Sequence, residues 1–137
     1  MRRIFLTQLA ALLLLLPLFS VFSINPAEAA CASNGRCYGA VGVGPRGAWG
    51  NAYNYPSSRS AIRAVQRNCK GNCTTIKSFY NTCGAIAQGD NGGWGWAWHG
   101  NQNEARSQAI AYCVPNDRNC RIRSWACTSR YIAFVGL

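Results

Sequence analysis

Few residues in this chain could perform acid–base catalysis. The sequence has 137 residues, with 14 Lys+Arg, 4 Asp+Glu and one histidine, His99. Glu104 follows soon after His99, and a Glu/His pair among arginines can cleave RNA by proton transfer with a cationic clamp on the phosphate. His99 and Glu104 are therefore the candidate catalytic residues of a small secreted nuclease-like hydrolase or toxin. Each also has a structural explanation, because His99 ends a predicted strand and Glu104 lies near a predicted helix start.

The same composition excludes several kinds of active site. Paired-carboxylate hydrolases and calcium sites need clustered Asp and Glu, and this chain has too few acids for them. A two-histidine metal centre needs a second histidine. A zinc ribbon is an alternative use of the eight cysteines, but their spacing lacks the doubled C-x2-C pattern. No metal or cofactor is predicted, and the residues favour binding over catalysis.

Residues 1–29 have the pattern of a secretory signal peptide. Arg2 and Arg3 precede an almost wholly apolar stretch at residues 9–22, and Ala27-Glu28-Ala29 supplies the small residues that signal peptidase requires. An uncleaved membrane anchor is one alternative, but the apolar run is shorter than the roughly 20 residues that span a bilayer. A lipoprotein acylated at Cys31 is another, but a glutamate stands where a lipobox has an aliphatic residue.

Cleavage after Ala29 leaves residues 30–137 as a single domain with all eight cysteines. Its 12 basic and 3 acidic side chains give a net charge of +9, which attracts an acidic protein partner or anionic envelope polymers. An exported chain with this many cysteines is expected to be oxidised, in the periplasm or outside the cell. No stable membrane span is predicted after cleavage.

The mature chain contains one pattern twice, in units of about residues 37–81 and 82–130. Gly39 aligns with Gly84 at a spacing of 45 residues, and Cys69 aligns with Cys113 at a spacing of 44. After the second cysteine of each unit the spacing becomes 46, which aligns Phe79 with Trp125. Such self-similarity indicates an internal duplication. Each unit is predicted to fold as strand, strand, helix, strand.

The predicted helices begin at Ser57 and Asn101, which are good N-cap residues, and end near Cys69 and Cys113. Small residues recur every four positions on one face of each helix, which suits a close approach to a strand of glycine and alanine: Ala61, Val65 and Cys69 in the first, Ala105, Ala109 and Cys113 in the second. The turn Asp90-Asn91-Gly92 is typical of a hairpin. The fold class is therefore predicted as α+β, an antiparallel sheet with two helices on one face, stabilised by disulfides.

Alternation on the strands predicts a binding surface. Strand 93–99 has tryptophan at every second position, and the predicted third strands, 73–80 and 120–127, each carry a basic and an aromatic residue on one face. If the helices cover the opposite face, the exposed binding residues are Trp94, Trp96, Trp98, Lys77, Arg121, Arg123 and Trp125. Aromatic and arginine side chains dominate binding hot spots. The alternative is that the tryptophan row is core, as it usually is in small domains.

The cysteines predict a disulfide framework. Cys69 with Cys73 and Cys113 with Cys120 recur at the same place in both units and are expected to pair locally. Cys83 opens and Cys127 closes the second unit, so they form the third expected pair. Cys31 and Cys37 then remain for the N-terminal arm. This pairing is inferred from the duplication, because spacing alone allows many connectivities.

Several motifs between Cys37 and Cys127 resemble a bacterial family described as domain of unknown function 4189. They are CYGAVGV, GAWGNAYNYPS, CGAIAQGDNGGWGWAWHG and EARSQAIAYC, in this order and followed by paired cysteines. The resemblance implies a small, exported, cysteine-bearing protein, and it transfers no catalytic residue.

These observations favour an exported, non-enzymatic binding protein. The leading hypothesis is a protein–protein binder of the inhibitor or immunity type, which uses a basic and aromatic face. One alternative is a cationic binder of envelope or host polyanions, in which charge supplies the affinity. The other is the nuclease-like hydrolase that would use His99 and Glu104.

Overall fold

The structure is a computed structural model that describes residues 31–128, so the predicted signal peptide lies outside the described residues. The first unit contains β1 (Tyr38–Val43), the short 3-10 turn η1 (Pro45–Gly47), β2 (Trp49–Tyr55), α1 (Ser58–Asn68) and β3 (Thr75–Tyr80). The second contains β4 (Cys83–Gln88), β5 (Trp94–His99), α2 (Gln102–Cys113) and β6 (Arg121–Cys127). Both units have the predicted order of strand, strand, helix and strand.

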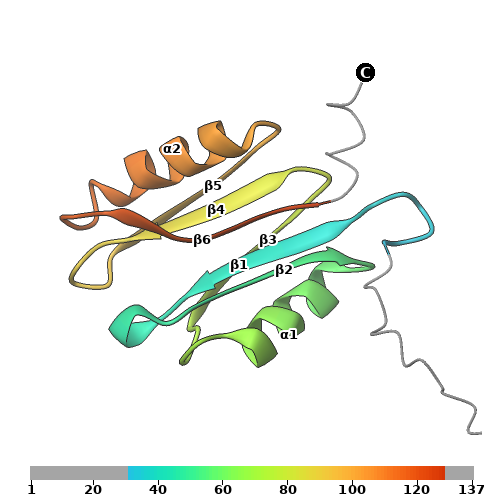
Figure 1. The fold of residues 1–137 in the computed structure, drawn as a ribbon, viewed down its shortest axis with the longest axis horizontal. Helices are drawn as coiled ribbons and strands as arrows, with labels where there is room; N and C mark the ends of the chain where they lie inside the picture. Colours follow the sequence, from blue (N-terminus) through green and yellow to red (C-terminus); the bar gives the residue numbers. More distant parts are fainter. Residues whose placement is uncertain (1–30, 129–137) are drawn as a thin grey trace, which may run out of the picture.

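Each unit forms its own antiparallel sheet of three strands, in the order β2-β1-β3 and β5-β4-β6. The two sheets stack face to face, and each carries its helix on the outer side, so the layers run helix, sheet, sheet, helix (Figure 1). The α+β class is confirmed. The prediction of one sheet with both helices on one face is wrong, because there are two sheets and their helices lie on opposite sides.

Small residues hold each helix close to its sheet. Ala61 and Val65 of α1 pack against Ala40 and Ala52, and the alanines of α2 pack in the same way on β4 and β5. A Cβ atom on Gly95 would lie 2.2 Å from the backbone nitrogen of Cys113, so the backbone of α2 rests directly on β5. The predicted caps are present, because the side chains of Ser57 and Asn101 accept hydrogen bonds from the first turns of α1 and α2.

The second layer of packing lies between the sheets. Val41 and Val43 of β1, Ile86 of β4, Phe79 of β3 and Ala126 of β6 form a buried cluster there. The central strands β1 and β4 are thus buried on both faces, with small residues toward the helix and larger ones toward the other sheet. The face that the sequence assigned to solvent is this interface, which is why one sheet could not satisfy the pattern.

The phenyl ring of Phe79 lies at the centre of the interface. A Cβ atom added to Gly39 of β1 would lie 2.5 Å from this ring, and one added to Gly84 of β4 would lie 2.3 Å from it. One side chain therefore fills the space above two glycines, one in each sheet. Phe79 is 5% exposed.

The structure contains four disulfides, which are the pairs expected from the sequence: Cys31–Cys37, Cys69–Cys73, Cys83–Cys127 and Cys113–Cys120. Cys83–Cys127 joins β4 to β6 within one sheet, and Cys69–Cys73 and Cys113–Cys120 link each helix end to the segment before the third strand.

Within residues 31–128, no helix is long and apolar enough to cross a membrane.

Replacing Phe79 with alanine should lower the free energy of unfolding by about 3–5 kcal/mol, because it leaves a cavity that the flanking glycines cannot fill. Urea unfolding of the oxidised protein measures this loss. The matched control is Tyr112→Ala, which removes an aromatic side chain that is 59% exposed and should cost less than about 1 kcal/mol. Equal losses in the two variants would show that Phe79 does not hold the sheets together.

Candidate functional site

The tryptophan row of β5 is split between core and surface. Trp94 and Trp96 are half-buried and pack against the cluster between the sheets, whereas Trp98 is 60% exposed. The Nζ atom of Lys77 lies 4.9 Å from the ring centroid of Trp94 and 5.9 Å from that of Trp96. These cation–π contacts join β3 to β5 at one edge of the stacked sheets. Lys77, Trp94 and Trp96 therefore contribute to the packing of that edge.

A β-bulge in β6 separates the other predicted binding residues. Ile86 pairs with Ser124 while Ala87 pairs with Ile122, so Arg123 is the extra residue. Gly39 and Gly84 occupy equivalent positions in the two units. Phe79 pairs with Gly39 and Ala126 pairs with Gly84, so Phe79 and Ala126 are the equivalent residues in the structure. The sequence alignment of Phe79 with Trp125 is thus wrong by one position.

Trp125 consequently lies on the opposite face of β6 from Ala126. Its ring centroid is 6.0 Å from the guanidinium carbon of Arg106 on α2, and the side chain is 41% exposed. The sequence placed Arg123 and Trp125 on one face and Ile122 with Ser124 on the other. The extra residue breaks that alternation, because Ile122 packs toward α2 while Ser124 donates a hydrogen bond to Gly50 O across the sheets.

A groove of about 1080 Å³ lies where the edge strands β2 and β6 meet. We call it the β2–β6 groove. Its walls come from β2, from β6 and from the start of α2: Trp49, Asn51, Tyr53, Asn101–Asn103 and Arg123–Cys127. Tyr53 is 56% exposed, so two aromatic side chains, Tyr53 and Trp125, are accessible beside an arginine.

Arg123 is the best-positioned charge in this groove. Its Nη2 atom donates a hydrogen bond of 2.6 Å to Gly47 O in the first unit. The φ angle of Gly47 is 75°, which favours glycine, and a Cβ atom there would lie 2.7 Å from the same Nη2 atom and would displace the guanidinium. The Nε atom of Arg123 is buried without a hydrogen-bond partner among the described residues. The guanidinium is thus held between the two units by the hydrogen bond from its Nη2 atom to Gly47 O.

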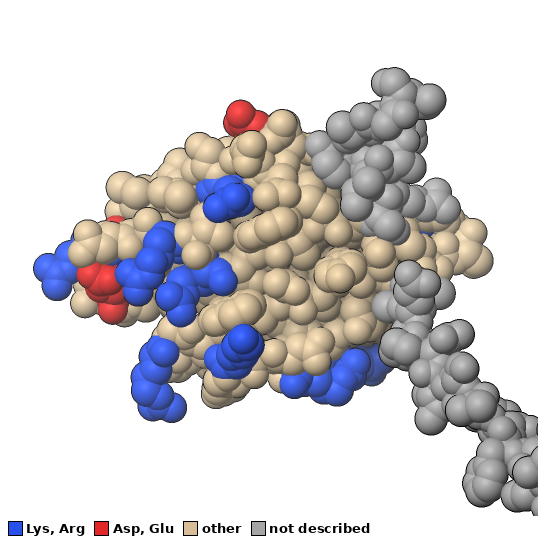
Figure 2. Space-filling view, viewed as in Figure 1, with Lys and Arg blue, Asp and Glu red and all other residues tan. Residues whose placement is uncertain are grey.

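Arg123 also borders a second hollow, of about 640 Å³, between η1 and the β4–β5 turn. Arg46 and Arg121 line it together with Asp90, and Arg121 forms an exposed ion pair of 3.3 Å with that carboxylate. Lys and Arg side chains gather at this end of the molecule, around a notch between the layers (Figure 2). Positive charge therefore continues from the groove to the hairpin end.

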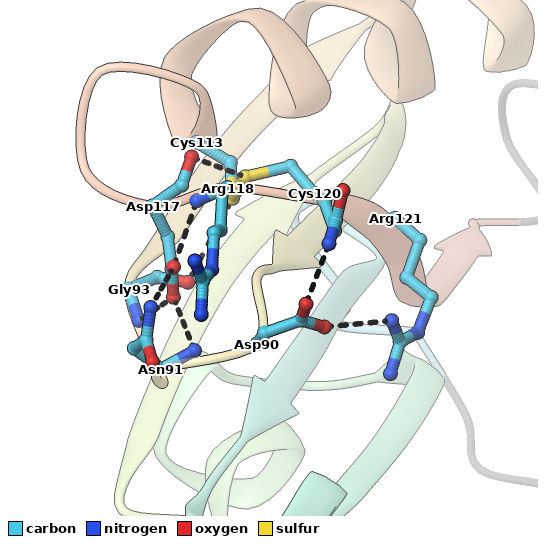
Figure 3. A network of polar contacts seen from close by, with 9 residues as sticks. Asp90, Asn91, Gly93, Cys113, Asp117, Arg118, Cys120 and Arg121 are labelled. Carbon is cyan, nitrogen blue, oxygen red and sulfur yellow. Dashed lines mark hydrogen bonds and ion pairs between the residues drawn. A yellow bond between two sulfur atoms is a disulfide. The ribbon is translucent and has the colours of Figure 1, made fainter.

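The two aspartates at this end have structural roles (Figure 3). The carboxylate of Asp117 accepts hydrogen bonds from the backbone N–H groups of Asn91 and Gly93 at 2.8 Å, and it also accepts one from the side chain of Asn91 at 2.9 Å. The loop after α2 thereby holds the β4–β5 turn. Asp90 accepts from Asn119 at 2.7 Å as well as from Arg121. The hydrogen bond from Asn119 is the main cause of the lowered pKa of Asp90, and Arg121 lowers it further.

His99 and Glu104 lie at the start of α2, but the structure does not join them. The Nδ1 atom of His99 accepts the backbone N–H of Asn101 at 2.9 Å, and Asn101 in turn accepts the N–H of Glu104 at 3.3 Å. His99 thus takes the place that a capping glutamate would fill. Within residues 31–128 the only ion pair is Arg121–Asp90, so Glu104 forms none with His99. That part of the chain also holds no group of three His, Cys, Asp or Glu residues that could bind a metal.

The sequence did not single out Arg46, Trp49 or Tyr53 as binding residues. Alternation in β2 was the available signal, since Trp49, Asn51 and Tyr53 all lie on one face of that strand and line the groove. What the sequence lacked was the position of β2 beside β6, because the two strands belong to different units.

Together these features define a disulfide-bonded α+β domain of two stacked sheets with a basic, aromatic groove at one edge. The chain belongs to the family described as Domain of unknown function (DUF4189), whose model matches residues 38–127. It is similar to the NMR structure of Rv1813c from Mycobacterium tuberculosis, with 26% identity and a TM-score of 0.50 over 66% of this chain and 74% of that one. Comparison with curated proteins gives no match.

Acidification should destabilise the domain through Asp117. Burial alone would raise the pKa of this carboxyl, but the N–H groups of Arg118, Gly93 and Asn91 outweigh it, and the pKa is lowered on folding. Because its pKa is lowered on folding, the ionised carboxylate of Asp117 stabilises the fold at pH values above the unfolded pKa of about 3.9. This stabilisation is lost as the pH falls through the pKa of the folded state.

Asp117→Asn should therefore flatten the fall in melting temperature between about pH 5 and pH 2. Thermal unfolding followed by circular dichroism across this range measures the effect. Glu104→Gln, outside the network, is the control and should keep the wild-type fall. An Asp117→Asn curve parallel to the wild type would contradict the role of this carboxylate.

Proposed function

We propose that this chain is an exported binding protein without enzymatic activity, which acts in the periplasm or outside the cell. Its partner is an acidic protein, of the kind bound by inhibitor or immunity proteins, and it docks in the β2–β6 groove. The observation that carries this proposal is the fixed guanidinium of Arg123 beside the accessible rings of Tyr53 and Trp125. The four disulfides are consistent with export.

The geometry suits recognition of a protein surface. Arginine and aromatic side chains carry most of the free energy in protein interfaces, and they do so best in partly desolvated positions. Arg123 is held before any partner arrives, so little conformational entropy is lost when it binds. Asn51 and Asn103 add side-chain amides along the walls, which can donate to and accept from a partner's backbone.

The charge distribution points to an acidic partner. Asp90 and Asp117 are used within the turns at the hairpin end, and Glu104 lies beside the cap of α2. The arginines of the groove and the adjoining hollow outnumber the one carboxylate, Asp90, that lines them. Such a surface would steer an acidic partner and raise its association rate.

A hydrolase is less well supported, because His99 uses its Nδ1 atom to cap α2 and has no carboxylate beside it among the described residues. The orientation of His99 therefore has a structural cause.

The proposal predicts that Trp125→Ala and Tyr53→Ala each weaken partner binding by about tenfold or more, since each removes an aromatic anchor. The tagged, oxidised protein is used to capture partners from its own envelope fraction and culture fluid, with washes at about 0.15 M and 0.5 M salt. A stoichiometric protein that resists the second wash is identified by mass spectrometry, and its affinity for each variant is measured by calorimetry.

Trp98→Ala is the matched control, because Trp98 is at least as exposed as Tyr53 and Trp125 but lies on β5, outside the groove. It should bind like the wild type. Loss of binding in Trp98→Ala alone would move the interface to the opposite edge of the sheets. Recovery of only polyanions that are lost at the higher salt concentration would rule out a protein partner. Cleavage of RNA by the wild type that is lost in His99→Ala would favour the hydrolase.

A further inference from the structure

The outer face of α1 carries a line of three arginines. Arg59, Arg63 and Arg67 recur every four residues, so they lie on one side of the helix, and all three are exposed. The opposite side of α1 packs on its sheet through Ala61, Ala64 and Val65. Basic side chains are visible along the lower edge of the molecule, where α1 lies in Figure 1 (Figure 2). We call these three residues the arginine stripe.

The stripe works against the stability of its own helix. Like charges four residues apart on a helix repel each other, by about 0.2–0.5 kcal/mol for each pair. Arg59 lies in the first turn, where the helix dipole disfavours a cation, and Arg67 lies in the last turn, where the dipole favours one, so these two effects offset each other and the repulsion remains. Among residues 31–128 the only ion pair is Arg121–Asp90, so no carboxylate offsets this repulsion.

The second unit shows that the fold does not require these arginines. The alignment that pairs Ala61 with Ala105 and Cys69 with Cys113 places Asn103, Ser107 and Ala111 of α2 at the positions of the stripe. All three are exposed, as the arginines are. The α2 helix also packs on its sheet through small buried residues, Ala105, Ala109 and Cys113, and does so without this charge. The packing of the helix on its sheet therefore does not account for the arginines.

We infer that the arginine stripe binds a linear phosphodiester polymer of the nucleic-acid type, at a site separate from the β2–β6 groove. Exposed ion pairs with scattered carboxylates contribute little, because both partners are already well hydrated. A polymer of high charge density behaves differently, since it carries condensed counterions whose release on binding supplies the free energy. Guanidinium groups also match phosphate oxygens with two parallel hydrogen bonds.

The shape of the stripe favours a polymer over a membrane. The arginines form a single line along a convex helix, and the exposed residues beside them are polar, including Gln66 and Asn68. Helices that bind at a membrane surface insert large apolar side chains beside their basic residues. The outer face of α1 has none, so it offers charge along one line and nothing to insert.

The test measures binding of a labelled oligothymidylate by fluorescence anisotropy at several salt concentrations. The stripe variant combines Arg59→Gln, Arg63→Gln and Arg67→Gln, which keeps good helix-forming residues. For single strands the slope of log K against log salt is about −0.7 for each phosphate contact, so the variant should reduce its magnitude by about 2. Between about 0.05 and 0.2 M salt, the wild type should therefore lose about 20-fold more affinity than the stripe variant does.

A second triple variant, Arg36→Gln, Arg106→Gln and Arg118→Gln, removes the same charge from outside α1. It should reduce the slope by less than half as much as the stripe variant. Equal reductions would overturn the inference, because net charge alone would then explain binding. Anionic vesicles provide a further arm, and stripe-dependent binding to vesicles without binding to the oligonucleotide would assign the surface to lipid instead.

Thermal unfolding shows that the variants are folded and adds an independent readout. The stripe variant should melt no lower than the wild type, since it loses the repulsion along α1. A clear fall in its melting temperature would mean that the arginines stabilise the fold, and the inference would fail. Because the groove residues are untouched, capture of a protein partner should be unchanged, so this inference and the proposed function can fail separately.

Discussion

The contact of one phenyl ring with two glycines determines how this domain is built. Phe79 lies over Gly39 in its own sheet and over Gly84 in the other, and the small Ala126 leaves room for it. The sheets can approach only because no side chain rises from either glycine. Each central strand must then present small residues to its helix and larger ones to the opposite sheet, and the helices are forced to the outside of the stack.

The groove follows from this stacking. With β1 against β4 at the centre, the edge strand β2 lies beside β6, and β3 lies beside β5, as the contacts of Lys77 with Trp94 and Trp96 show. One edge is closed by those contacts. At the other, the bulge at Arg123 turns Trp125 outward and brings the guanidinium onto Gly47, which leaves a hollow lined by both units. A surface of this kind belongs to neither unit alone.

The sequence was informative where local chemistry decides the structure. Ser57 and Asn101 cap their helices, the alanine spacing selects the buried helix faces, and the repeated cysteines give the short bridges, because each of these depends on neighbours along the chain. It could not show whether the face of each sheet opposite its helix meets solvent or a second sheet. Lys77 was misleading in this respect, since a cation packed on tryptophan rings can lie at the edge of an apolar interface.

The candidate site was harder to predict because it arises where the two units differ. One extra residue in β6 shifts every later side chain to the other face, and no composition signal marks it. Phe79 consequently lies in the core, while Trp125, its partner in the sequence alignment, lines the groove. Along the helices the difference is in charge, with arginines on α1 where α2 has Asn103, Ser107 and Ala111. Positions that pack each helix on its own sheet are alike in the two units, so the exposed positions at which the units differ are the places where binding is to be sought.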